Sequence, residues 1–259
     1  MEQELEPRIK GALGEYLLRL GDDMLVLGHR LSEWCGHGPI LEEDVALANM
    51  ALDDIGQAEA LLKLAGLVEG KGRNEDDLAY FREEFEFRNL TMLEQPRGDF
   101  SYTMMRQFLF CSFTYLFYNE LTKSRHEALA GLAAKGLKEI TYHLRHAREW
   151  VLRLGDGTDE SHDRISRSLE ELWRFTDEFF FMDHVDALLI GEGMAPDLEA
   201  LRAPWLEMVS GVLLEATLQV PGDSAAKAEG SRLGRHSEHL GHMLAQMQIL
   251  ARSHPGARW

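Results

Sequence analysis

The chain has 259 residues, of which 45% are hydrophobic and 27% are charged, a composition typical of a globular protein rather than a disordered one. Its formal net charge of −17 argues against a nucleic-acid-binding surface, because phosphate recognition requires clustered Lys and Arg. The charge favours solubility and leaves open an acidic face for a basic protein partner. The acidic N-terminus lacks a signal-peptide core, and no segment approaches the ~20 apolar residues of a membrane span, so we expect a cytoplasmic protein.

Apolar residues recur with a helical period along nearly the whole chain, and no convincing strand alternation interrupts it. The pattern predicts four long helices, at residues 9–34, 41–67, 100–124 and 127–154. Breaks rich in Gly and Pro, such as the one at residues 35–39, end these helices because neither residue continues a helix cheaply. The third long helix is apolar over most of its circumference, which indicates a buried helix.

Shorter helices are predicted around this core, at residues 75–85, 197–218 and 234–252. A further one follows the potential cap at residues 159–161 and includes Phe175 and Phe179. The two cysteines show no disulfide framework or metal-binding spacing. We therefore expect one all-α domain over residues 1–259, a ferritin-like four-helix bundle with additional flanking helices and an N-terminal arm at residues 1–10.

The second and fourth long helices contain near-matches to a metal-binding motif. In ferritin-like di-iron bundles, two helices each have Glu-x-x-His and two others each have a Glu, all pointing into the core. Here the corresponding residues are Asp54-x-x-Gln57 and Ile140-x-x-His143. An amide oxygen is a weak ligand and Ile140 has none, and the middles of the other two helices are poor in carboxylates. We predict a degenerate di-iron site, with no catalytic residue, metal or cofactor in this chain.

Two other patterns leave metal binding open, and the first lies on the fourth long helix. Glu139 and His143 are four residues apart and share a helix face, so they could meet one metal ion, although a surface hydrogen bond or ion pair between them is the favoured interpretation. The nearby Arg145, His146 and Arg148 complete a basic cluster. This cluster could pair internally with acidic side chains of the same helix or meet an acidic partner or ligand.

The second pattern is a group of histidines near the C-terminus. Three imidazoles at His236, His239 and His242 would need a fourth ligand to form a zinc site, and their spacing rotates them around the helix. A polar helix start with Glu238 paired to His242 is favoured instead. Trp259 at the extreme C-terminus could anchor to a partner.

Several long segments, matched in order from about residue 16 to residue 259, resemble the C subunits of bacterial phenylacetyl-CoA epoxidase. They are LRLGDDMLVLGHRLSEWCGHGP, ALANMALDDIGQA, EQPRGDF, KEITYHLRHAREWVLRLGDGTDES, LWRFTDE, EATLQVP and HSEHLGHMLAQMQ. The resemblance implies a multicomponent oxygenase that converts phenylacetyl-CoA to its ring 1,2-epoxide in aerobic phenylacetate breakdown. It also implies three partners: a catalytic A subunit that holds the di-iron centre and the CoA thioester, a small B subunit, and a transiently bound iron–sulfur flavoprotein reductase.

In this family the C subunit shares the ferritin-like fold, lacks the iron ligands and binds the A subunit tightly. The resemblance then implies that Gln57 and Ile140 stand where the catalytic sister chain has ligands, and that Asp54 and His143 are remnants. We expect a non-catalytic structural subunit, capable of self-association when isolated. The alternative is an autonomous ferritin-like metal-binding protein or oxidoreductase that uses Glu139 with His143, or His236 with His239.

Overall fold

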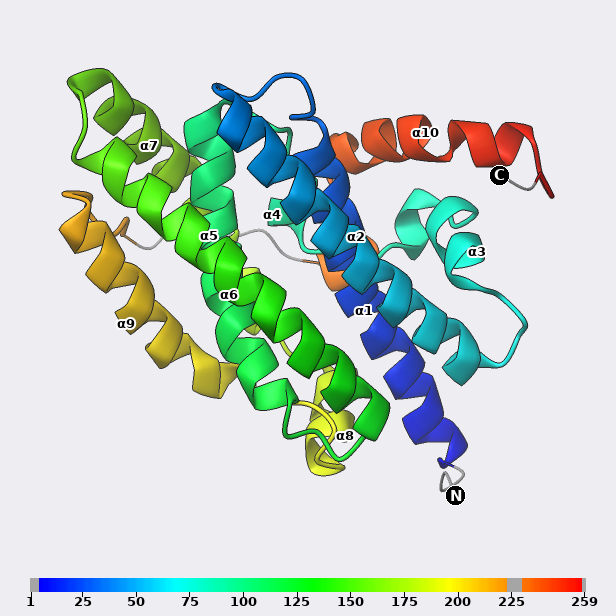
Figure 1. Ribbon diagram of the computed structural model, residues 1–259. Helices are drawn as coiled ribbons and strands as arrows, with labels where there is room; N and C mark the ends of the chain where they lie inside the picture. The colour runs from blue at the N-terminus through cyan, green and yellow to red at the C-terminus, as the bar shows by residue number, and fades with distance from the viewer. Residues whose placement is uncertain (1–4, 223–229, 258–259) are drawn as a thin grey trace.

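The computed structural model describes residues 5–222 and 230–257, and within these ranges the chain is built from helices without a strand. Four long helices dominate it (Figure 1). They are α1 (Pro7–Ser32), α2 (Leu41–Glu69), α5 (Phe100–Leu121) and α6 (Glu127–Gly155). α1 packs most extensively on α2, and α5 on α6, so the bundle consists of two consecutive helix pairs. The all-α prediction and the four long helices are confirmed.

Shorter elements surround this bundle. They are α3 (Glu75–Tyr80), α4 (Thr91–Glu94), α7 (Asp159–Trp173), α8 (His184–Gly191), α9 (Glu199–Glu215), α10 (Glu238–Ser253) and the 3-10 turns η1 (Glu84–Glu86), η2 (Thr176–Phe180) and η3 (Ser231–Leu233). Helices α7 and α9 pack on α5 and α6, α8 packs on α1, and α10 lies across α3, α4 and η1. In Figure 1, α9 and α10 lie on opposite sides of the bundle.

Capping side chains account for several helix boundaries. Asn74 forms a capping box at the start of α3, Asp99 accepts a hydrogen bond from the N–H of Tyr102 at α5, and Thr158 forms a capping box at α7. The cap of α7 is therefore Thr158 rather than residues 159–161. Helix α2 ends at Glu69, and its C-cap Gly70 has a φ of 73°, in the left-handed region that favours glycine.

Some expected boundaries differ from the structure. α1 begins at Pro7, a residue suited to the first helical turn, so residues 7–10 of the expected arm are helical. Phe175 and Phe179 follow α7 and lie in the turn that leads through η2. α10 begins at Glu238, four residues later than predicted. α8 was missed because its eight residues span too few turns for a clear periodic signal.

The hydrophobic core extends from the four long helices into the flanking ones. α5 is buried over most of its length, as its apolar sequence indicates, whereas α6 buries one stripe that includes Ile140, His143 and Ala147. Side chains of α7, α9 and α10 join the same core cluster. No helix within residues 5–222 and 230–257 combines the length and apolar character needed to cross a membrane.

Candidate functional site in the bundle core

The four residues singled out by the motif analysis lie on facing surfaces of α2 and α6. Asp54 and Gln57 are on α2, and Ile140 and His143 are on α6; all four side chains are buried. Residues three apart share one face of a helix, which explains why each pair points into the core. The structure brings Asp54 and His143 together, with 3.6 Å between Asp54 Oδ1 and His143 Nδ1.

Gln57 links α2 to both α5 and α6 through its amide. The hydroxyl of Tyr118 donates to Gln57 Oε1 at 3.0 Å, and Gln57 Nε2 donates to Glu139 Oε2 at 2.8 Å. Gly136 leaves the space for this chain of hydrogen bonds, because a Cβ there would lie 2.6 Å from Tyr118 Cε2 and 2.8 Å from Gln57 Oε1. Gln57 therefore acts as a bridge between helices rather than as a free ligand.

His143 makes its hydrogen bond to α2 and not along α6. Its Nε2 lies 3.1 Å from Asp53 Oδ2. The expected surface pair between Glu139 and His143 is wrong, because each of these side chains reaches across to α2, Glu139 to Gln57 and His143 to Asp53. Burial lowers the pKa of His143, and the hydrogen bond from Asp53 opposes this only in part. The imidazole is therefore neutral at pH 7.

Asp54 is the least satisfied polar group of the site. It is fully buried, and neither carboxyl oxygen has a hydrogen-bond partner among the described residues. Burial raises the pKa of Asp54 well above its usual value, and the negative charges of Asp53 and Glu139 raise it further. Folding consequently favours the protonated form of Asp54, beside an imidazole whose neutral form is also favoured by burial.

These residues do not fit a di-iron centre. Two cations need roughly four carboxylates and two imidazoles, whereas the buried groups that face each other here are one carboxyl and one imidazole. Gln57 is occupied by hydrogen bonds and Ile140 offers only hydrocarbon. In the described part of the chain, no three or more His, Cys, Asp and Glu side chains are grouped so as to hold a metal ion.

His236 is engaged in the protein through both ring nitrogens. Nδ1 lies 2.7 Å from Glu94 Oε2, and Nε2 donates to the carbonyl of Phe87 at 3.0 Å. Burial acts to lower the pKa of His236, but the hydrogen bond and charge of Glu94 outweigh it, so that the pKa is raised. Because Ser237 is the N-cap of α10, His236 precedes the helix and does not share a face with His239.

The other polar side chains of these two regions also differ from expectation. No interaction joins Glu238 to His242 within the described residues, so the favoured pairing at the start of α10 is not formed. On α6, two of the basic residues pair with acids of other elements: His146 Nε2 lies 2.8 Å from Glu43, and Arg148 lies 2.7 Å from Glu215. Arg145 lies over the ring of Tyr142 on the same helix. Trp259 lies outside the described residues.

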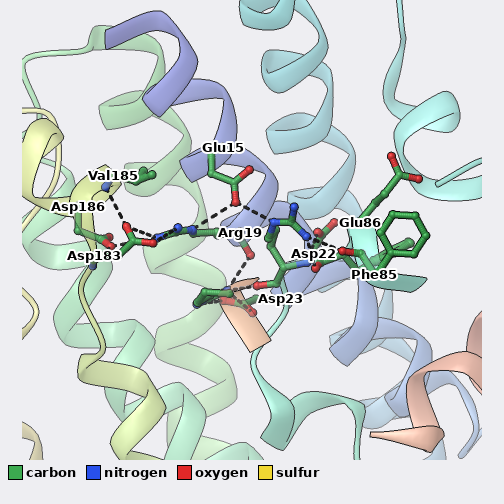
Figure 2. Close-up of polar contacts among 12 residues, drawn as sticks. Glu15, Arg19, Asp22, Asp23, Phe85, Glu86, Asp183, Val185 and Asp186 are labelled. Atoms are coloured by element: carbon green, nitrogen blue, oxygen red, sulfur yellow. Dashed lines mark hydrogen bonds and ion pairs between the residues drawn. The ribbon is translucent and has the colours of Figure 1, made fainter. Parts of the chain in front are cut away.

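A set of buried ion pairs that the sequence did not predict is centred on α1. Figure 2 shows Arg19 extending from α1 to Asp183 and Asp186 near the start of α8, at 2.6 Å and 3.0 Å. Asp22 pairs with Arg82, and Asp23 pairs with Arg232 at 2.8 Å. The available signal was the Asp22-Asp23 dipeptide within an otherwise apolar stretch of a long helix. These acids, in the helix that could have contributed a metal ligand, instead hold distant segments against α1.

Comparison with known proteins places the chain in a family. The profile of the family described as Phenylacetic acid catabolic protein matches residues 2–259. The chain belongs to this family. A curated relative, the C subunit of the 1,2-phenylacetyl-CoA epoxidase of Escherichia coli (strain K12), is 47% identical over 247 residues, which cover 95% of this chain and 99% of the relative. The resemblance and the ferritin-like helical bundle expected for this phenylacetic acid catabolic family are confirmed.

Proposed function

We propose that the chain is the structural, non-catalytic subunit of a phenylacetyl-CoA 1,2-epoxidase that acts in aerobic phenylacetate breakdown. The name of the 47% identical relative supports the enzyme complex. The observation that supports the non-catalytic role is the hydrogen-bonded bridge from Tyr118 through Gln57 to Glu139, which engages both ends of the Gln57 amide. The proposed partners are a catalytic A subunit holding a di-iron centre, a small B subunit and, transiently, a reductase.

A sister chain that binds no metal can stabilise the complex. An open iron site buries several carboxylates, and desolvation of charged groups weakens a bundle unless their pairing is excellent. In this chain the corresponding space is filled by Ile140, which is fully buried, and by the bridging amide of Gln57. A bundle packed in this way is suited to bracing the catalytic bundle, while the chemistry takes place in the partner.

The alternative is an autonomous metal-binding protein or oxidoreductase, and no contact in the described residues favours it. Glu139 and His143 instead each make their hydrogen bond to α2, Glu139 to Gln57 and His143 to Asp53, and neither bonds to the other. A metal bound by His236 would have to displace Glu94 or the carbonyl of Phe87, and His236 does not share a helix face with His239.

The test is purification of the full chain, alone and co-expressed with its catalytic sister chain in iron-rich medium. We expect the chain alone to contain much less than one iron per molecule, and the pair to co-purify as a stable complex that contains iron and supports turnover once the other components are added. Two tightly held irons in the isolated chain would contradict the non-catalytic role. Failure of the two chains to co-purify would contradict the bracing role.

A further inference from the structure

Helix α2 has an apolar stripe on the side that faces away from the bundle. Leu41, Val45 and Leu52 share this stripe, because steps of four and seven residues return to the same side of a helix, and all three side chains are exposed. α5 is likewise apolar over most of its circumference, but α6, α7 and α9 pack around it. A helix that is apolar on its inward and outward sides is usually buried, so the outward side of α2 lacks the cover that α5 has.

Helix α6 runs beside α2 on the side of the bundle that faces the viewer in Figure 1, and it completes this surface. Its outward row contains Tyr142, which is partly exposed, with Lys135 and Lys138 on the preceding turns and Arg145 on the next one. Lys138 and Arg145 form no ion pair with any described residue, and Arg145 lies over the ring of Tyr142, 5.6 Å from its centre. In a chain with a net charge of −17, this side of α6 is therefore locally basic.

The hydrogen bonds that join α2 to α6 also fix the levels of the outward side chains. His143 Nε2 of α6 lies 3.1 Å from Asp53 Oδ2 of α2. Leu52 and Tyr142 directly precede these two residues in the chain, so they lie at the same level along the bundle. They form the apolar centre of a surface that we call the α2–α6 face, made of the outward side chains of residues 41–59 on α2 and 135–153 on α6.

An acidic residue of α2 lies level with basic residues of α6 on the same face. Gln57 donates to Glu139 at 2.8 Å, and since α2 and α6 run in opposite directions, Glu59 lies level with Lys135 and Lys138. All three of these charged side chains are exposed. A twofold axis parallel to the helices would lay α2 of one copy of the chain on α6 of another and keep these levels. It would set Glu59 of each copy against Lys135 and Lys138 of the other, so the α2–α6 face is complementary to itself.

We propose that the isolated chain forms a twofold-symmetric homodimer through the α2–α6 face. Leu52 of each copy packs on Tyr142 of the other, and Glu59 of each copy pairs with Lys138 of the other. The two helices have 29 residues each, so the face is about 40 Å long and about 20 Å wide, on the order of the 800 Å² that each partner contributes to a standard interface. The homodimer does not rest on the proposed function, because it forms without the catalytic sister chain.

The test is analytical ultracentrifugation of the full chain, alone, over a range of concentrations. We expect a mass of twice the 29.5 kDa of the chain, with a dissociation constant on the order of 1 μM or lower for an interface of this area. The dissociation constant should rise with salt concentration, because salt screens the exposed charges that pair across the interface. A chain that stays monomeric at every concentration would overturn the proposal, including the case in which the α2–α6 face binds the catalytic sister chain instead.

Two matched variants assign the dimer to this face. Leu52→Glu, at a side chain that is 67% exposed, puts an unpaired charge against Tyr142 twice in each dimer and should raise the dissociation constant at least about a hundredfold. Ile249→Glu makes the same kind of change at a 64% exposed residue of α10, which packs on α3, α4 and η1, and should leave the dimer intact. Circular dichroism should show the wild-type helix content in both variants. A dimeric Leu52→Glu, or an equal loss of affinity in both variants, would overturn the proposal.

A charge exchange tests the twofold pairing itself. Glu59→Lys should raise the dissociation constant at least about tenfold, because it sets like charges against each other across the interface. Adding Lys138→Glu to the same chain should restore the dissociation constant to within about threefold of the wild-type value, since it supplies an acid opposite the new cation. If the second substitution fails to restore the dimer, α2 of one copy does not lie on α6 of the other, and the proposal is wrong.

Discussion

Asp54 illustrates how the environment of a single residue decides its chemistry. Its two oxygens have no hydrogen bonds, it is fully buried, and two further carboxylates lie nearby, so that folding favours the protonated form. The folded chain thus retains a proton that the unfolded chain releases. The free energy of unfolding falls as the pH rises from the ordinary Asp pKa of 3.8 towards the raised value, by about 1.4 kcal/mol per unit.

Asp54→Asn should remove this dependence, because an amide has nearly the same shape and cannot ionise. Relative to the wild type, we expect the variant to gain stability with increasing pH, by at least about 1 kcal/mol between pH 5 and pH 8. Urea unfolding at the two pH values measures the difference. A stability difference that does not change with pH would show that Asp54 is ionised in the folded chain. Glu59→Gln, at an exposed position of the same helix, serves as the control for removal of a carboxylate.

His236 is a basic group, and it also makes the free energy of unfolding depend on pH. Its pKa is raised because Glu94 outweighs the effect of burial, so the protonated form is favoured by folding. This contribution to stability is fully present below the unfolded pKa near 6.5 and is lost as the pH rises through the folded pKa.

Replacement of this imidazole tests the ion pair. His236→Gln should lower the free energy of unfolding by about 3 kcal/mol at pH 6, because it leaves the buried Glu94 carboxylate without its counter-charge. At a pH above the raised pKa of His236 the loss should be smaller by about 1 kcal/mol or more, since the wild-type imidazole is then neutral as well. Guanidinium unfolding at the two pH values gives both numbers. An equal loss at the two values would mean that His236 is uncharged at pH 6.

The residue types that face each other on α2 and α6 were predictable from the sequence, but their partners were not. The spacing of Asp54 with Gln57 and of Ile140 with His143 places each pair on one helix face whatever the tertiary structure. Gln57 contacts Tyr118 of α5 and Glu139 of α6 because of how the three helices pack. The local sequence does not predict that packing. The buried acids of α1 were missed for the same reason, since their cationic partners come from distant segments.

At the scale of helices, the close approach of α2, α5 and α6 depends on Gly136. Gly136→Ala would push a methyl group against the ring of Tyr118 and the amide of Gln57, and repacking should lower the free energy of unfolding by about 1–3 kcal/mol. Gly131→Ala on the same helix is the matched control, because no atom lies within 4 Å of its Cβ position. That control should raise stability by about 0.5–1 kcal/mol through helix propensity. Thermal unfolding of both variants measures the two changes in stability. Equal changes in the two variants would contradict tight packing at Gly136.

The long helices could be predicted because their apolar period extends over many turns, and their ends agree with the structure within two or three residues. Short elements depend on local hydrogen bonds instead. α4 has four residues and follows a backbone N–H at Leu90 that is held by Asp23 of α1, so its position is fixed by tertiary contact rather than by its own sequence. α10 begins late for a similar reason: His236 and the N–H of Ser237 are both held by Glu94, which keeps this stretch out of the helix.

At the scale of the whole molecule, the contacts between α2 and α6 and the buried ion pairs of α1 stabilise the same bundle. The ion pairs fasten α8 and the segments that contain Arg82 and Arg232 to α1, while the Gln57 bridge joins α2 to the second helix pair. The interior of the bundle is thereby taken up by contacts between helices, which suits a subunit whose role is to support another chain. A substitution in the degenerate site should then change stability and leave chemistry in the complex unaffected.

His143→Ala in the assembled epoxidase complex tests this expectation. The substitution leaves a cavity at a fully buried position and should lower the melting temperature of the isolated chain, at a cost of about 2–4 kcal/mol. Ile140→Ala is the matched control, because it creates a cavity one turn away on the same face of α6 without removing a titratable group. If His143 is only a remnant, the complexes containing either variant should turn over phenylacetyl-CoA at rates within about twofold of the wild type per assembled complex, since neither substitution changes the free-energy barrier of the reaction. Both should also retain the iron of the catalytic sister chain. A collapse of turnover confined to His143→Ala, with the complex intact and its iron in place, would assign His143 a part in the reaction and contradict the structural role.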